Sequence, residues 1–390
     1  MLTMTDPVRS APANISSLET PCLLLDLDRL ERNCSAMLAR AKALGVMLRP
    51  HLKTAKSRDV ARIATGGEGG AITVSTLREA EYFARGGHKD ILLAAGIAPN
   101  KLAHAAHIQR ETGCDLILIT DSAEVVAAAA RFASDEDVTL SFLIEIDCGE
   151  HRGGLLPDDS RVVPLAQAIV AAPRLRLRLR GVMTHGGHSY GTNVANEIKA
   201  IAAVERDAVV TAASAIRAAG LPCEIVSVGS TPTALFADRL DGVTEMRPGV
   251  YTFMDLMMVG RNVCREEDIV ASVLACVIGH NRQARSILLD SGALALSKDV
   301  GAHKYLPQAG YGYVCDARSL QRLGSLAVDI VYQEHGVVKI DDEAWFERLP
   351  VGSLVRVLPN HTCMTCAAFD AYEVVRGDTI IARWARVNGW

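Results

Sequence analysis

The sequence of 390 residues has no excess of basic residues, no long hydrophobic run and no obvious secretory signal. Its formal net charge of −4 argues against a nucleic-acid partner, because proteins that bind nucleic acids normally present a basic patch. No apolar run reaches the length of about eighteen residues that a membrane-spanning helix needs. The first twenty residues lack a basic segment followed by an apolar one, which predicts a cytoplasmic protein.

A disulfide framework is also missing, although the chain contains ten cysteines. They stand mostly alone in apolar segments, as Cys34, Cys148 and Cys276 do. Scattered single cysteines are typical of reduced core thiols. Only HTCMTC, residues 361–366, places cysteines next to a histidine.

What the sequence does contain, over its first two thirds, is a regular alternation of short β-rich runs and alanine-rich helical segments. In one helical segment, STLREAEYFARGG, Ser75 or Thr76 is expected to cap the helix, with Glu79 at a capping-box position and Gly86 at the end. Candidate strands occupy residues 46–51, 71–75, 90–95, 114–120, 140–147, 179–185, 223–230 and 243–249. Eight such units predict an α/β fold, a (β/α)8 barrel over about residues 28–265.

After residue 265 the pattern changes to strand-like runs joined by turns. We therefore expect an all-β domain over residues 266–390. The strand-like segment TPCLLLDL, residues 20–27, is not one of the eight and is expected to pair with this β domain, which would then be discontinuous. Residues 1–19 are expected to form an N-terminal segment outside both domains.

The stretch RPHLKTAKS, residues 49–57, places Lys53 directly after the first barrel strand. Active sites of such barrels lie at the carboxyl ends of the strands. Partial desolvation, or a neighbouring cation such as Arg49 or Lys56, would lower the pKa of the Lys53 amine and suit it to Schiff-base chemistry. The alternative interpretation is a structural lysine that pairs with an acidic loop.

Two loops, SVGSTPT (227–233) and RPGVYTF (247–253), follow the seventh and eighth candidate strands. Barrel enzymes often bind a phosphate at this place. A glycine in each loop would let backbone N–H groups approach an anion closely. Together with Lys53, the loops predict pyridoxal 5′-phosphate, held covalently at one end and by its phosphate at the other.

Arg152, in EIDCGEHRGG, follows the fifth candidate strand and should also reach the mouth of the barrel. An always-charged guanidinium facing the pyridine nitrogen would keep that nitrogen unprotonated. The alternative is a surface arginine in a turn.

The segment PNHTCMTC, residues 359–366, carries His361 and Cys363. Two positions apart on an extended segment, they are expected to point to the same face, and imidazole with thiolate suits zinc. Two protein ligands would leave positions open for water and substrate, which favours a catalytic metal. A core thiol beside a turn histidine and a redox pair of Cys363 with Cys366 are the alternatives.

Seven segments carry a resemblance that covers nearly the whole chain, from about residue 19 to Trp390: RPHLKTAKS, GGAITVSTLREAE, EIDCGEHRGG, SVGSTPTA, VTEMRPGVYTFMD, QEHGVV and PNHTC. Together they resemble the D-serine dehydratase and D-threonine aldolase family of fold-type III pyridoxal-phosphate enzymes, which is related to alanine racemase. The resemblance is greatest to the dehydratase branch, which includes D-threo-3-hydroxyaspartate dehydratase.

The resemblance implies roles for particular residues. Lys53 would hold the cofactor covalently and act as the catalytic base, and Arg152 would face the pyridine nitrogen. His361 and Cys363 would hold a divalent metal. The other implied cofactor-binding residues are Tyr190, Gly229, Ser230, Thr231, Gly249, Val250 and Tyr251. His185 and His188 end the sixth candidate strand at the mouth of the barrel, so one of them, taken to be His185, is expected to contact the cofactor or the substrate.

Two departures from the aldolase pattern favour dehydration. The family's dehydratases have histidine and cysteine at the metal positions, whereas its aldolases typically have histidine and aspartate, so Cys363 fits a dehydratase. Residues 73–76 read TVST where the aldolases tend to have a cysteine and a glutamine.

The implied reaction converts D-threo-3-hydroxyaspartate, D-serine or D-threonine to a 2-oxo acid and ammonia, while the metal lowers the basicity of the departing hydroxyl. Aldol cleavage to glycine and an aldehyde is the main alternative. A pyridoxal-phosphate carrier and an amino-acid racemase are further alternatives, but neither needs the metal motif. Zinc suits the two ligands best, manganese, cobalt and nickel are tolerated, and a homodimer is implied by the resemblance.

Overall fold

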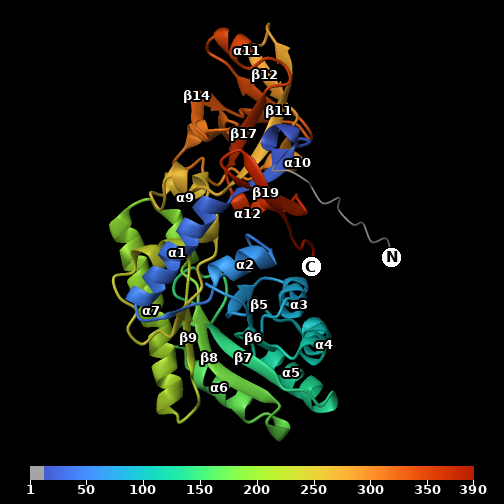
Figure 1. Ribbon diagram of the computed structural model, residues 1–390. Helices are drawn as coiled ribbons and strands as arrows, with labels where there is room; N and C mark the ends of the chain where they lie inside the picture. The colour runs from blue at the N-terminus through green and yellow to red at the C-terminus, as the bar shows by residue number, and fades with distance from the viewer. Residues whose placement is uncertain (1–12) are drawn as a thin grey trace. The chain divides into compact units, whose positions relative to one another are not determined.

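The structure is a computed structural model that describes residues 13–390 (Figure 1). Most of the expected N-terminal segment, residues 1–12, lies outside the described residues. The chain forms two compact units. One contains residues up to Leu30, Phe253–Gly260 and Cys264–Arg386, and the other contains Glu31–Thr252, Arg261–Val263 and Val387–Trp390.

The second unit contains a parallel sheet of eight strands curled into a barrel. In chain order these are β3 (Met47–Leu48), β4 (Ile72–Val74), β5 (Asp90–Gly96), β6 (Asp115–Thr120), β7 (Leu140–Ile146), β8 (Leu177–Thr184), β9 (Ile225–Val228) and β10 (Glu245–Met246). The sheet closes just beyond β3, where the Leu52 amide donates to the Thr73 carbonyl at 2.8 Å and the Thr73 amide donates to the Pro50 carbonyl at 2.9 Å. All eight expected strands are present, and the predicted (β/α)8 barrel is confirmed.

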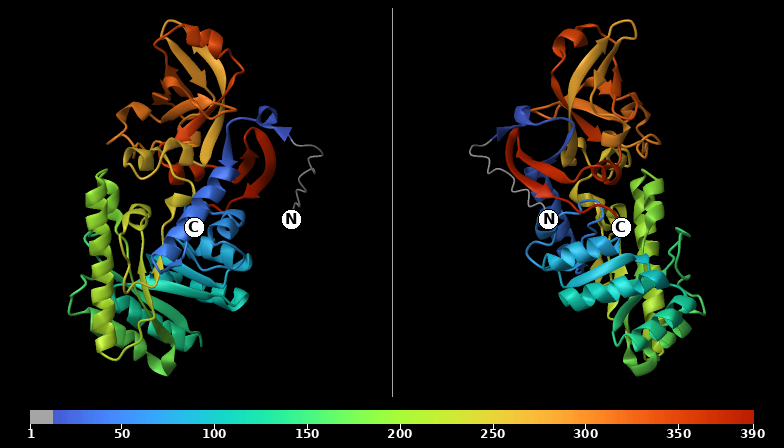
Figure 2. Two further views of the ribbon diagram at one scale, coloured as in Figure 1. Left: turned by 60° about the vertical axis from the view of Figure 1, so that its left-hand side comes forward. Right: turned by 90° about the vertical axis from the view of Figure 1, so that its right-hand side faces the viewer.

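Helices alternate with these strands and enclose them (Figures 1 and 2). They are α1 (Leu27–Ala43), α2 (Arg58–Ala64), α3 (Leu77–Arg85), α4 (Leu102–Thr112), α5 (Ala123–Asp135), α6 (Val162–Val170), α7 (Ala195–Ala218) and α8 (Thr231–Phe236). Helix α3 begins as expected: the Thr76 hydroxyl accepts the Glu79 amide, the Glu79 carboxylate accepts the Ser75 amide, and the helix ends at Gly86. Buried apolar residues of the strands, including Leu92, fill the barrel.

The other unit is built mainly of strands. They are β1 (Ala13–Asn14), β2 (Cys22–Asp26), β11 (Ala271–Asn281), β12 (Ser286–Leu289), β13 (Gly312–Asp316), β14 (Arg322–Ala327), β15 (Ile330–Val331), β16 (Gly336–Lys339), β17 (Leu354–Pro359), β18 (Ala371–Arg376) and β19 (Thr379–Ala385). Strand β2 pairs antiparallel with β11 and parallel with β18. Four short helices complete this unit: α9 (Leu256–Gly260), α10 (Ala293–Leu296), α11 (Ala344–Arg348) and α12 (Thr362–Cys366).

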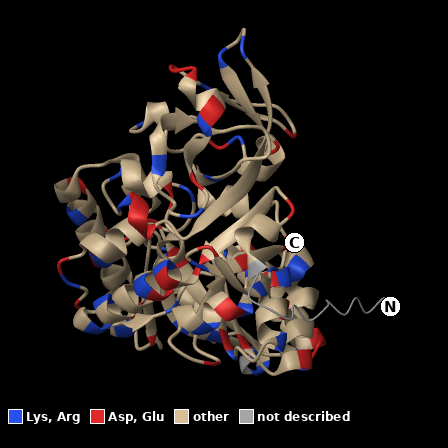
Figure 3. Cartoon of the chain, turned by 45° about the horizontal axis from the view of Figure 1, so that its top comes forward, with Lys and Arg blue, Asp and Glu red and all other residues tan. Residues whose placement is uncertain are grey.

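Three general properties of the chain are its potential membrane-spanning helices, its disulfides and the distribution of its charges. Within residues 13–390 no helix combines the length and the apolar character needed to cross a membrane. None of the ten cysteines, all of which lie in this range, forms a disulfide. Acidic and basic residues are interspersed over the part of the chain that the structure describes (Figure 3).

Candidate active site

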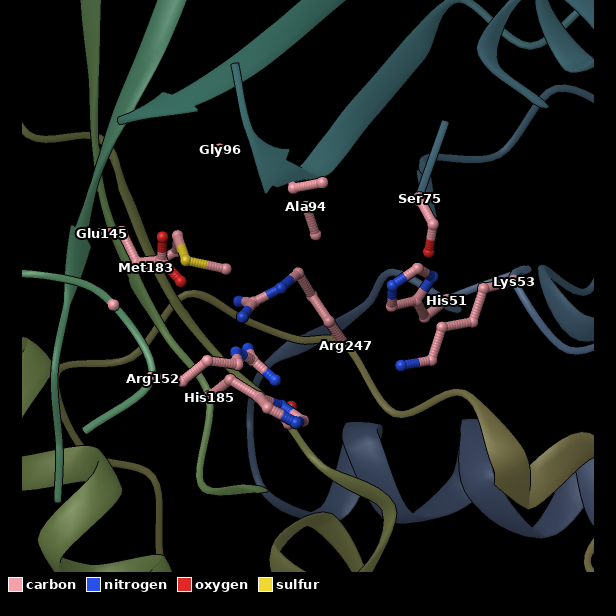
Figure 4. Close-up of a pocket in the computed structure, with 13 residues that line it drawn as sticks. His51, Lys53, Ser75, Ala94, Gly96, Glu145, Arg152, Met183, His185 and Arg247 are labelled. Atoms are coloured by element: carbon pink, nitrogen blue, oxygen red, sulfur yellow. The ribbon is translucent and has the colours of Figure 1, made fainter. Parts of the chain in front are cut away.

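A cavity of about 340 Å³ opens at the carboxyl ends of the barrel strands (Figure 4). Loops and strand ends from most of the sheet contribute to its lining, which includes His51, Lys53, Glu145, Arg152, His185 and Arg247. Four residues predicted from the sequence, namely Lys53, Arg152, His185 and Gly229, are therefore brought together. This is the edge of the barrel where the strand-end loops meet.

Lys53 lies in the turn after β3, and its amine points into the cavity from that side (Figure 4). The two cations expected to act on it are ion-paired elsewhere. Arg49 is buried and contacts Glu245, and Lys56 contacts Glu79 with an N–O distance of 3.2 Å. Both side chains leave the loop toward carboxylates, in directions that sequence proximity does not reveal.

Lys56 instead fixes the loop that carries Lys53. Its partner Glu79 has a side chain only 1% exposed and also accepts the Ser75 amide at 2.9 Å. The Lys56 carbonyl accepts the Val387 amide at 2.9 Å. The second lysine of RPHLKTAKS is thus structural, and the first faces the cavity.

Two histidines in the cavity wall are held in the neutral form. Burial lowers the pKa of His185 to about 3, and the nearby cations Lys53 and Arg152 act in the same direction. Its Nδ1 donates to the Gly229 carbonyl at 2.5 Å. This hydrogen bond raises the pKa of His185 and so partly offsets the effect of burial. Burial, followed by the charges of Lys53 and Arg247, lowers the pKa of His51 well below its usual value.

Two arginines reach the cavity, and they differ in burial. The Arg152 side chain is 58% exposed and lies 3.5 Å from a carboxylate oxygen of Glu150. Arg247 is only 4% exposed, and burial lowers the pKa of its guanidinium to about 10, so it stays charged at neutral pH. Burial raises the pKa of Glu145, while Arg152 opposes this shift. Arg247 was not among the predicted site residues, although its place at the end of the eighth strand was a usable signal.

The two predicted phosphate loops pack against each other. Ser230 caps α8 and accepts the Thr233 amide at 3.1 Å, and the Thr231 hydroxyl accepts the Tyr251 amide at 3.2 Å. The Thr231 amide donates to the Tyr190 hydroxyl at 3.4 Å. Tyr190, Ser230, Thr231 and Tyr251 are thus neighbours, as expected of one binding site.

Two backbone amides in these loops fit an anion. Among the described residues, no acceptor is bonded to the amides of Gly249 and Val250, at the start of a short 3-10 helix, Val250–Thr252. A Cβ at Gly249 would lie 3.0 Å from the His51 carbonyl oxygen, so only glycine lets the two backbone segments approach this closely. These features fit a bound phosphate group.

Gly229 is held in a conformation that other residues rarely adopt, and we predict a measurable effect of replacing it. Its φ is +155°, and a Cβ would lie 2.5 Å from the Arg247 amide nitrogen. We expect Gly229→Ala to lower the free energy of unfolding by about 1–3 kcal/mol, because the backbone must shift. Urea denaturation would measure this. Gly191→Ala is the control, since a Cβ there meets nothing within 4 Å; an equal effect of both changes would contradict the prediction.

His361 and Cys363 lie in the β-rich unit, at the start of α12. His361, which precedes the helix, is extended as expected, but Cys363 lies inside the helix, so the extended segment predicted for both residues was wrong at Cys363. The two side chains still interact, because Cys363 acts on the pKa of His361. Burial lowers the pKa of His361, but Cys363 and Asp255 outweigh it and raise the pKa to about 10.

Asp299 orients the His361 ring. Nδ1 of His361 lies 2.7 Å from Oδ2 of Asp299. A carboxylate on one ring nitrogen directs the other nitrogen toward a metal, as in many zinc proteins. Within residues 13–390, however, no group of three or more His, Cys, Asp or Glu side chains is arranged to hold a metal ion. The imidazole nitrogen of His361 and the sulfur of Cys363 are donors of the kind that suit zinc.

Comparison with known proteins identifies relatives over almost the full length. The family described as "Alanine racemase, N-terminal domain" matches residues 25–256, and the "Putative serine dehydratase domain" matches residues 271–375. D-threo-3-hydroxyaspartate dehydratase of Delftia sp. (strain HT23) is 44% identical, over 96% of this chain and 98% of that protein. The 3-hydroxy-D-aspartate aldolase of Paracoccus denitrificans (strain Pd 1222) is 31% identical, over 96% of this chain and 94% of that protein.

One solved structure shares a similar fraction of identical residues with this chain. It is a cysteine-to-alanine mutant of D-threo-3-hydroxyaspartate dehydratase "in the metal-free form", with a TM-score of 0.91 and 42% identity. The match covers 97% of this chain and 100% of that one.

Proposed function

We propose that this chain, which belongs to the alanine racemase-like family of D-3-hydroxy amino acid dehydratases and aldolases, is a pyridoxal-phosphate-dependent dehydratase that releases ammonia and a 2-oxo acid. The observation that carries the proposal is the Lys53 amine in a cavity that also holds two guanidinium groups. The 44% identity to D-threo-3-hydroxyaspartate dehydratase over nearly the whole chain supports it.

The cavity and the two glycine loops suit pyridoxal phosphate. When bound, the cofactor supplies an electron sink for the charge left on the α-carbon. Lys53 provides the amine for its covalent attachment, and the amides of Gly249 and Val250, with the Ser230 hydroxyl, suit its phosphate. Tyr190, whose hydroxyl accepts the Thr231 amide, would lie beside this group.

Of the two arginines, we assign Arg247 rather than Arg152 to the ring nitrogen. A group that faces one ring atom must be held in place, and Arg247 is buried, whereas Arg152 is more than half exposed. A guanidinium at that place would disfavour a protonated ring. Arg152, on its exposed loop, is then available for a substrate carboxylate.

Lys53 is also the group we assign to the α-proton. Its amine is exposed to the cavity, so it can reach a substrate bound there and act as general base. His185, held by the Gly229 carbonyl, has a pKa lowered to about 3 by burial and is therefore too weak a base to compete for the proton.

His361 and Cys363 are the residues that we assign to a divalent metal, with Asp299 orienting the imidazole. A metal there would supply Lewis-acid stabilisation for the oxygen that leaves the β-carbon. Nitrogen and sulfur donors favour zinc over manganese, cobalt or nickel.

The choice among the three substrates rests mainly on the relatives. Lys53 and Arg247 are assigned to the cofactor, so Arg152 is the basic lining residue left for a substrate carboxylate, and Glu145 is the acidic residue among the described lining residues. The D-threo-3-hydroxyaspartate dehydratase of Delftia sp. is 44% identical to this chain. We therefore infer that D-threo-3-hydroxyaspartate is preferred over D-serine and D-threonine.

An end-point assay would test the proposal. The purified protein, supplied with pyridoxal phosphate and zinc or manganese, would be incubated with D-threo-3-hydroxyaspartate, D-serine and D-threonine in separate tubes. We expect ammonia and a 2-oxo acid in equal amounts, without glycine, and fastest from D-threo-3-hydroxyaspartate. Glycine with an aldehyde and no ammonia would instead establish the aldolase reaction, which the 31% identical aldolase makes the second candidate.

A further inference from the structure

A chain of hydrogen-bonded side chains runs through the barrel interior, from Arg247 in the cavity to Asp90 at the start of β5. Arg247 donates to the Ser227 hydroxyl, and that hydroxyl donates to Oε1 of Glu245 at 2.5 Å. Oε2 of Glu245 accepts from Nε of Arg49 at 2.8 Å. Arg49 completes the chain by donating from both terminal nitrogens to the Asp90 carboxylate, at 2.6 and 3.1 Å.

Only the Asp90 end of this chain is open to solvent. Ser227, Glu245 and Arg49 are at most 1% exposed, and the Asp90 side chain is 42% exposed. Two guanidinium groups alternate with two carboxylates, so the charges balance along the chain. A buried charge is tolerated when it is paired and hydrogen-bonded in this way.

The chain determines how the Arg247 guanidinium is oriented. One terminal nitrogen bonds to Ser227 in β9, and the other donates to the Thr184 carbonyl in β8 at 2.5 Å. Two bonds to neighbouring strands fix the plane of the group, because guanidinium donors have a rigid planar arrangement. The other charged or titratable groups around it are Glu205 on α7, Glu145 on β7, Arg49, His51 and His185.

We propose that Glu245, acting through Ser227, is a positioning residue that holds Arg247 in the orientation needed to face the cofactor ring. Arg49 and Asp90 hold the Glu245 carboxylate in turn. This inference rests on the proposed function, because it assigns a role to the side chain that we place against the ring nitrogen. It goes beyond that function because none of Ser227, Glu245, Arg49 and Asp90 lines the cavity.

Ser227→Ala tests the proposal, because it breaks the link without changing volume or charge. We expect the equilibrium dissociation constant of pyridoxal phosphate to rise about tenfold, the size of one lost charge-assisted hydrogen bond. The absorption spectrum of the bound cofactor should also shift. With D-threo-3-hydroxyaspartate, kcat should fall about tenfold while KM changes little, because the link acts on the cofactor and not on substrate binding.

Ser141→Ala is the matched control. Ser141 is also buried in the barrel, in β7, and donates to the Asp115 carboxylate at 2.9 Å, but it is not part of this chain. The two variants should lose similar thermal stability. The cofactor spectrum and dissociation constant should change only in Ser227→Ala.

Equal cofactor binding and equal spectra in wild type, Ser227→Ala and Ser141→Ala would overturn the inference and leave the chain with a purely structural role. If Ser227→Ala does not fold, Glu245→Gln replaces it, because the amide keeps the shape but removes the charge. An unchanged cofactor spectrum in that variant would also overturn the inference.

The proposed function is tested separately by the wild-type protein. Failure of wild type to bind pyridoxal phosphate would refute that function, whereas normal turnover in Ser227→Ala would refute only the positioning role.

Discussion

Replacing Lys53 by alanine should abolish turnover and the absorption of bound pyridoxal phosphate while leaving the apoprotein as stable as wild type. Loss of a positioned general base costs about 10²–10⁴-fold in rate, and loss of the covalent attachment adds to this. Stability should change by no more than about 0.5 kcal/mol, since the Lys53 side chain is exposed. Steady-state kinetics, absorption spectra and urea denaturation would measure the three effects.

Lys56→Ala is the control for this experiment and should behave in the opposite way. It leaves the nearly buried Glu79 carboxylate without its cation, which should cost about 1–3 kcal/mol of stability. The folded variant should still show the absorption of bound cofactor. If Lys53→Ala kept its cofactor absorption and Lys56→Ala lost it, the two lysines would have been assigned the wrong way round.

Removing the metal should stop dehydration without removing the cofactor. Lewis-acid assistance at the leaving oxygen is worth several kcal/mol, so exhaustive chelation or Cys363→Ala should lower kcat by about a thousandfold. The absorption of bound pyridoxal phosphate should persist in both cases, because no residue of the cavity lining belongs to the metal pair. Elemental analysis of the purified protein would identify the metal and measure its loss.

Cys366→Ala separates the metal hypothesis from a general thiol effect. Cys366 is buried in the same short helix, and its sulfur lies 3.6 Å from the Thr362 hydroxyl. It should retain both metal and turnover. Full activity after exhaustive chelation, or equal losses in Cys363→Ala and Cys366→Ala, would rule out a catalytic metal at His361 and Cys363.

The barrel strands were predictable because burial leaves a mark in the sequence. A parallel strand covered on both faces must be almost continuously apolar, as in DLILIT of β6, and each such run is followed by a helix that covers it. The start of α3 was predictable for a related reason. The Thr76 hydroxyl accepts the Glu79 amide and the Glu79 carboxylate accepts the Ser75 amide, so the start of the helix is satisfied by residues next to it in sequence.

The local structure at His361 could not be predicted in this way. The amide of Thr362, the first residue of α12, donates to the Asp255 carboxylate at 3.0 Å, across 107 positions of sequence. A helix whose first turn is satisfied by a distant residue carries no capping signal of its own. The apolar and hydroxyl residues of α12 are as compatible with an extended segment as with a helix.

The sequence by itself determined the order of strands and helices, the lysine after β3, the glycine loops after β9 and β10, and the histidine and cysteine at the start of α12. These depend on local periodicity, on strand ends and on residue chemistry. Only the tertiary structure decided which charged groups share one environment. It placed Arg49 against Glu245 and Asp90, Lys56 against Glu79, and Arg247 in the cavity wall. The reason is physical: a barrel brings together side chains from strands that are far apart in sequence, and burial forces each charge to find a partner among them.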